Sequence, residues 1–186
     1  EVVETYGIVT HVVPESNEGS AGNFFLQDPG GPGICEGIFI RDFDIVPNVG
    51  DKLTIKGLQN EYWSFTQIID IESHTVTSTG NSITPKLIST GDLIGCTLIG
   101  EQLEGMLVKI SNVNFEGQDD FDNWYVNDGS GQTLVDDYYF DGTFPTSVVD
   151  TDTITQIIGV VGYSYEKFRI YPRNEDDFIT CVAIGD

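Results

Sequence analysis

Basic residues are scarce in this chain: 8 lysines and arginines stand against 30 aspartates and glutamates, for a formal net charge of −22. The excess of acidic residues is spread over the chain. Residues 1–80 carry 3 basic and 12 acidic groups, and residues 81–186 carry 5 basic and 18 acidic groups. Such an exterior repels phosphate backbones and anionic lipids and attracts cations. The charge therefore argues against a nucleic-acid partner and favours metal ions.

Long apolar runs are also absent. The longest apolar stretches, such as residues 157–161, have the length of a β-strand, whereas a membrane helix needs about 20 apolar residues. No membrane insertion is therefore expected. No signal peptide is visible; a secreted chain whose leader has been removed looks like this, and so does an intracellular or trimmed one.

Cysteine and histidine are few and scattered. The three cysteines show no CxxC spacing, and His11 and His74 stand alone, which disfavours a zinc site. If one disulfide forms, we expect it between Cys96 and Cys181, because each flanks one end of the second repeat described below. Cys35 would then be a buried or free thiol.

Local motifs of common enzymes are missing: the sequence contains no GxSxG, P-loop, HExxH or dinucleotide-binding pattern. Acidic pairs are frequent, but such pairs arise by chance in a chain with 30 carboxylates. Without a histidine, lysine or aromatic partner at a fixed spacing they make no case for acid–base chemistry. We therefore expect a protein without catalytic activity.

The chain does have 21 glycines, many β-branched residues and an internal repeat with a spacing near 100 residues. The matching segments are residues 6–13 and 104–113, 23–30 and 123–129, 37–40 and 133–136, 49–57 and 150–159, and 61–68 and 163–170. Two copies at this spacing indicate two domains rather than a solenoid.

Within each copy, apolar and polar residues alternate with period two in segments bounded by Gly, Pro, Asn and Asp, which is typical of short strands. Five strands without a long amphipathic helix fit a small closed barrel, and closure removes exposed strand edges. We predict an all-β fold of two consecutive OB-fold-like five-stranded β-barrels. Residues 1–80 form the first, residues 81–99 a linker with one short helix at most, and residues 100–186 the second.

Five segments carry a family resemblance: Gly7–Thr10, Phe24–Asp28, Val49–Gly57, Leu103–Val108 and Phe168–Phe178. They resemble the OB-fold modules of secreted bacterial proteins, notably those beside extracellular endonuclease/exonuclease/phosphatase-type nucleases. The resemblance covers nearly the whole chain, and it implies an extracellular accessory or surface module with nucleic-acid or glycan contact. Because OB barrels serve many functions, it specifies the fold better than the function.

The richest acidic stretch predicts a calcium site, because calcium takes six to eight oxygens from carboxylate, amide and carbonyl groups. The stretch does not match an EF-hand loop, and a solvated acidic loop is the alternative. The candidate ligands are Asp119, Asp120, Asp122, Asn123, Asp136, Asp137 and Asp141.

The closing hairpin of each copy is rich in aromatic residues, which OB barrels can use to stack bases or sugars. The candidates are Tyr62, Trp63, Phe65, Tyr163, Tyr165 and Phe168. The basic groove that nucleic-acid binding requires is missing, because the local cluster of Lys167, Arg169 and Arg173 is followed at once by three acids. Cross-strand pairing and core packing are the alternative role of these rings.

Together these features predict a secreted, non-catalytic interaction or structural-assembly protein, supported by calcium. Its partner would be a second copy, in an oligomer or polymer, or another extracellular protein. Assembly could proceed by pairing of the N-terminal strand, Glu1–Thr5, with the sheet edge of a neighbour. The alternative is an accessory module of a secreted nuclease system that binds single-stranded nucleic acid or glycan.

Overall fold

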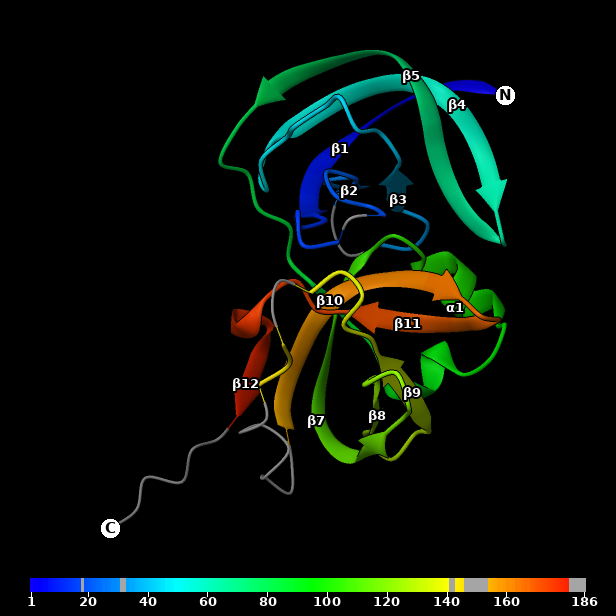
Figure 1. The fold of residues 1–186 in the computed structure, drawn as a ribbon, viewed down its shortest axis with the longest axis vertical. Coiled ribbons are helices and arrows are strands. Elements are labelled where there is room, and N and C mark those ends of the chain that lie inside the picture. The colour runs from blue at the N-terminus through cyan, green and yellow to red at the C-terminus, as the bar shows by residue number, and fades with distance from the viewer. Residues whose placement is uncertain (18, 31–32, 141–142, 146–153, 181–186) are drawn as a thin grey trace.

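The computed structural model of the chain describes residues 1–17, 19–30, 33–140, 143–145 and 154–180 (Figure 1). Strands dominate this part of the chain, and its one α-helix is the six-residue α1 (Leu98–Leu103). No helix within these ranges has the length and apolarity that crossing a membrane requires. The predicted all-β class is confirmed.

The first barrel is closed and has the strand order β1-β2-β3-β5-β4. The β3–β5 pair is parallel and the other pairs are antiparallel. Its interior is apolar, because inward positions alternate with polar outward ones, as β4 illustrates. The strands are β1 (Val2–Val12), β2 (Phe24–Gln27), β3 (Gly37–Ile40), β4 (Lys52–Tyr62) and β5 (Phe65–Ser78).

The second barrel repeats this order as β7-β8-β9-β11-β10, and the pairing of β10 with β7 closes the ring. The parallel pair recurs between β9 and β11. The prediction of two consecutive five-stranded, OB-fold-like barrels is therefore confirmed. The strands are β7 (Leu107–Gln118), β8 (Trp124–Asn127), β9 (Gln132–Val135), β10 (Ile154–Ser164), β11 (Lys167–Tyr171) and β12 (Phe178–Thr180), the last of which follows the 3₁₀ turn η3 (Glu175–Asp177) and pairs with β10.

The segment between the barrels was expected to hold one short helix at most. Its first part forms a two-residue strand, β6 (Lys86–Leu87), which pairs in parallel with β7. The 3₁₀ turn η1 (Thr90–Leu93) and α1 follow it. The strand edge of β7 supplies the backbone partners that this two-residue strand needs.

A cluster of buried side chains joins the two barrels. Phe25, Phe39 and Phe65 of the first barrel pack with Tyr139 and Tyr171 of the second. The ring centroids of Phe25 and Phe39 lie 4.9 Å apart, and those of Tyr139 and Tyr171 lie 4.7 Å apart. Such aromatic pairs add stability beyond the area they bury.

Backbone contact reinforces this junction. A Cβ atom on Gly37 would lie 2.2 Å from the carbonyl carbon of Gly105, so strand β3 and the turn just before β7 touch backbone to backbone. The amide of Cys35 donates a hydrogen bond to the carbonyl of Gln102 nearby. The two barrels therefore form one packed unit, stacked along the long axis of the molecule (Figure 1).

Candidate functional site

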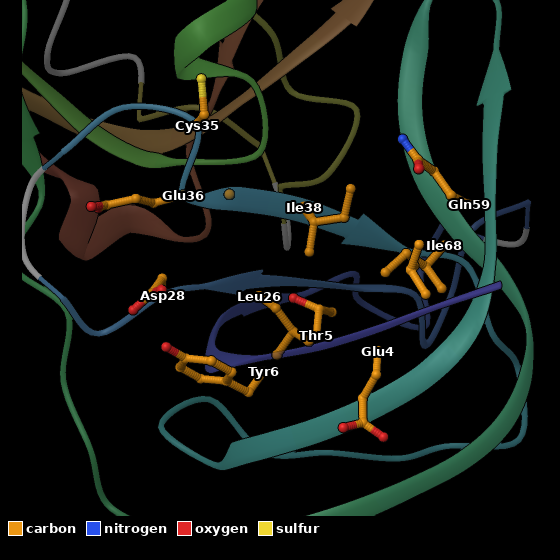
Figure 2. A pocket seen from close by; sticks show the side chains of 12 residues that line it. Glu4, Thr5, Tyr6, Leu26, Asp28, Cys35, Glu36, Ile38, Gln59 and Ile68 are labelled. Carbon is orange, nitrogen blue, oxygen red and sulfur yellow. The ribbon is translucent and has the colours of Figure 1, made fainter. Parts of the chain in front are cut away.

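The first barrel has an opening along β1. Residues Val2–Ile8 of β1 pair with β4, but pairing with β2 begins only at Ile8. Among the described residues, no strand covers the other edge of this first part of β1. An open pocket of about 350 Å³ lies between that edge and β3 (Figure 2). We call this pocket the open seam.

The floor of the open seam is apolar and belongs to the barrel interior. Leu26 of β2, Ile38 of β3 and Ile68 of β5 line it, together with Val3 and Thr5 of β1. Leu26 and Ile68 are buried, and Ile38 and Val3 pack against the core cluster of this barrel. The opening therefore gives access to core side chains.

The rim of the open seam is acidic. Glu4, Asp28 and Glu36 line it, and among the described lining residues there is no lysine or arginine. One oxygen of Asp28 accepts a hydrogen bond from the amide of Gly30, 2.8 Å away, and Glu36 accepts one from the amide of Gly33. Figure 2 shows Tyr6 and Asp28 at the same end of the pocket. The site suits a ligand with apolar and positively charged parts.

The registers of the two barrels identify the equivalent place in the second one. Val3 pairs with Gly57 in the first barrel, and Val108 pairs with Gly159 in the second. Both positions require glycine for the same reason. A Cβ on Gly57 would lie 2.7 Å from the Cγ2 atom of Ile68, and a Cβ on Gly159 would lie 2.7 Å from the Cγ2 atom of Ile170. Val108 and Lys109 of β7 therefore correspond to Val3 and Glu4 of β1.

The turn after the second strand of each barrel gives the same alignment. Asp28 follows β2 and accepts from the amide of Gly30; Asp128 follows β8 and accepts from the amide of Ser130, 2.9 Å away. Asp28 and Asp128 thus occupy equivalent positions in equivalent Asx turns.

In the second barrel, the place equivalent to the open seam is filled by the chain's own residues 86–103. β6 pairs with Val108 and Lys109, and the amide of Ile88 donates to the carbonyl of Lys109 at 3.0 Å. The rest of the segment completes the barrel core with three buried side chains, those of Ile88, Leu93 and Leu103.

Asp128 holds this segment in place. Its carboxylate accepts hydrogen bonds from the amide of Thr90 at 3.1 Å and from the Thr90 hydroxyl at 2.7 Å. Burial opposes ionisation of Asp128, but the hydrogen bonds from Ser130 and Thr90 outweigh it and lower its pKa to about 2. The counterpart Asp28 has no such incoming segment among the described residues.

The predicted calcium ligands are mostly engaged in the protein's own hydrogen bonds. Asp119 accepts from the amides of Phe121 and Asn123 and from the Asn123 side chain. Asp136 is buried and forms an ion pair with Arg169 at 2.6 Å. Within the described ranges, no group of three or more His, Cys, Asp or Glu side chains has a metal-binding arrangement.

The remaining predicted calcium ligands are Asp120, Asp122, Asp137 and Asp141. Asp120 and Asp122 are exposed. Burial raises the pKa of Asp137, and repulsion from Asp136, Asp122 and Asp119 adds to the shift. Asp141 lies outside the described residues. Calcium binding at this loop stays a prediction from charge.

The predicted aromatic site divides into buried and exposed rings. Phe65 and Phe168 are buried in core clusters, and Tyr163 is half-buried between two of them. Tyr62, Trp63 and Tyr165 are exposed, to 57%, 82% and 88%. Phe65 packs in the cluster between the barrels and Phe168 in the core of the second barrel, a division that the sequence pattern alone did not distinguish.

The thiols of Cys35 and Cys96 are exposed and free. Cys181 lies outside the described residues, so its pairing with Cys96 stays a prediction. Sequence reasoning missed the open seam, although Asp28 and Asp128 lie in matching segments of the repeat and could have indicated it. No protein-family model, curated protein or solved structure matches the chain.

Proposed function

We propose that the chain is a non-catalytic interaction module that binds an extended polypeptide segment at the open seam of its first barrel. One observation carries the proposal: the two barrels have equivalent seams, and residues 86–103 fill only the second. A strand edge with unpaired N–H and C=O groups accepts extended peptides through main-chain hydrogen bonds. The apolar floor would supply side-chain pockets.

The proposal keeps the expected non-catalytic and secreted role but changes the mode of assembly. The N-terminal strand was expected to join a neighbour, yet Val2–Ile8 pair with β4 in their own barrel. Its release would break that ladder. The strand therefore acts as the acceptor of a partner, through its second edge.

The test is selection of a displayed random peptide library on the full chain. Cys96→Ser combined with Cys181→Ser leaves Cys35 as the labelling site at the seam. A bulky maleimide on Cys35 then blocks the pocket. Peptides that bind the open chain should be lost on the blocked one. The proposal fails if no peptide is enriched, or if enriched peptides bind equally after blocking.

A second candidate function, binding of a neutral glycan, has its own supporting observation. Trp63 and Tyr165 occupy the same position in the β4–β5 and β10–β11 hairpin turns, with φ of 52° and 49°. Such turns favour Asn and Gly, and a bulky exposed ring at positive φ is costly, which points to a use for the ring. The acidic surface favours an uncharged sugar over a polyanion.

The glycan candidate is tested with Trp63→Asn, which removes the ring but suits the turn, so that stability is retained or raised. Neutral oligosaccharides titrated into the unmodified chain should give a heat response in calorimetry. The variant should lose the response, and Phe121→Asn, which removes an exposed ring elsewhere, should keep it. An unchanged response in Trp63→Asn would exclude this candidate.

A further inference from the structure

The segment that fills the second barrel's seam specifies what the first barrel's seam can hold. β6 runs parallel to β7, with Lys86 paired to Val108 and Leu87 to Lys109. Because Lys109 exchanges backbone bonds with this segment, its counterpart Glu4 presents its N–H and C=O groups to the open edge. An occupant of the open seam would therefore pair with Val3 and Glu4.

The far end of the seam has a matching acceptor. In the second barrel, Thr90 arrives at Asp128 two residues after Ile88 and donates its amide to the carboxylate. In the first barrel, the Gly30 amide occupies only one acceptor site on Asp28, and the side chain is half-buried on the rim. An extended segment pairing with Val3 and Glu4 would reach Asp28 with a backbone N–H.

Charge selects the occupant further. Three carboxylates line the open seam, against two lysines beside it: Lys56 pairs across the strands with Glu4, and the Nζ of Lys52 lies 5.6 Å from the ring of Tyr6. An acidic strand, including the N-terminal strand of a second copy, would be repelled, whereas lysine or arginine side chains would be attracted. The apolar floor at Leu26, Ile38 and Ile68 requires that the occupant also has apolar residues between its basic ones.

We propose that the open seam binds an extended, positively charged polypeptide segment, which pairs in parallel with β1 at Val3 and Glu4 and donates a backbone N–H to Asp28. This inference rests on the proposed function and adds the chemistry and the direction of the bound strand. The internal segment at residues 86–90 is the pattern: a basic residue, two apolar residues and two hydroxyl residues, the second of which reaches the aspartate.

The probe is a synthetic peptide with the sequence of residues 84–94 of this chain, in which the residue matching Asp92 is replaced by lysine. It is titrated into the full chain at low salt and followed by amide chemical shifts. We expect shifts at Val3, Glu4, Asp28 and Ile38, and weaker binding as salt is raised. Asp28→Ala and Glu4→Lys should each weaken binding about tenfold, whereas Glu166→Lys, in the β10–β11 turn outside the pocket lining, should not change it.

The direction of the strand separates this inference from the proposed function. A spin label at the N-terminus of the peptide should broaden the amide of Val2, and a label at its C-terminus the amide of Gly30. Reversed broadening, or shifts confined to Val108 and Asp128, would overturn the inference. The proposed function would still hold in that case if the library yields peptides whose binding is lost when Cys35 is blocked. If neither probe nor library binds, both fail.

Discussion

His11 and Glu104 are buried titratable residues at the junction of the barrels, and their pKa values move in opposite directions. Burial lowers the pKa of His11 to about 4, although a hydrogen bond between its Nε2 and the carbonyl of Tyr139 opposes the shift. Burial raises the pKa of Glu104 to about 7, against a hydrogen bond from the amide of Thr66. Near pH 6 both side chains are uncharged in the folded chain.

The two shifts give opposite pH dependences of stability. Below pH 6.5 the unfolded chain protonates His11 and the folded chain does not, so stability falls as the pH drops towards 4, by up to about 3 kcal/mol. The folded chain binds the Glu104 proton more tightly, so that contribution is present below pH 4.5 and is lost as the pH rises through 7.

Two variants separate these effects in urea unfolding between pH 4 and 8. His11→Phe should abolish the loss of stability at acidic pH and leave the Glu104 contribution, so that stability rises as the pH falls. Glu104→Gln, which keeps an acceptor for the Thr66 amide, should leave only the His11 effect. Profiles identical to that of the unmodified chain would contradict the assignment.

At the scale of elements, the two Asx turns differ in what they hold. Asp128→Ala removes two hydrogen bonds to Thr90 and should destabilise the chain by about 2 kcal/mol, because charge-assisted bonds at a half-buried site are lost. Asp28→Ala should change the free energy of unfolding by less than about 0.5 kcal/mol, since among the described residues its carboxylate receives only the Gly30 amide. Denaturant unfolding of both variants checks this, and equal effects would contradict the difference between the seams.

The strands could be predicted from the sequence because their cause is local. Alternation of apolar and polar residues, interrupted by turn residues, occurs twice, and glycine stands at position 57 of one copy and 159 of the other. β6 could not be predicted in this way, because two residues carry no alternation and the strand exists only where β7 offers an edge. The exposure of Trp63 against the burial of Phe65 likewise depends on contact with the second barrel.

At the scale of the whole molecule, the shared aromatic cluster and the contact of Gly37 with Gly105 couple the barrels. Thermal unfolding of the chain should therefore be a single cooperative transition. Gly37→Ala forces a methyl group against the backbone of Gly105 and should cost about 3 kcal/mol, with the transition broadening or splitting. Gly19→Ala, where the nearest atom would be 3.6 Å from the new Cβ, is the control. Calorimetry checks both variants, and an unchanged transition in Gly37→Ala would contradict the coupling.

Amide hydrogen exchange of the full chain tests the central claim most directly, because it compares the two equivalent seams in one molecule. Lys109 faces β6, and its amide should exchange slowly; the amide of its counterpart Glu4 should exchange rapidly and become protected when the basic peptide is added. Slow exchange at Glu4 in the absence of any ligand would contradict an open seam in the first barrel.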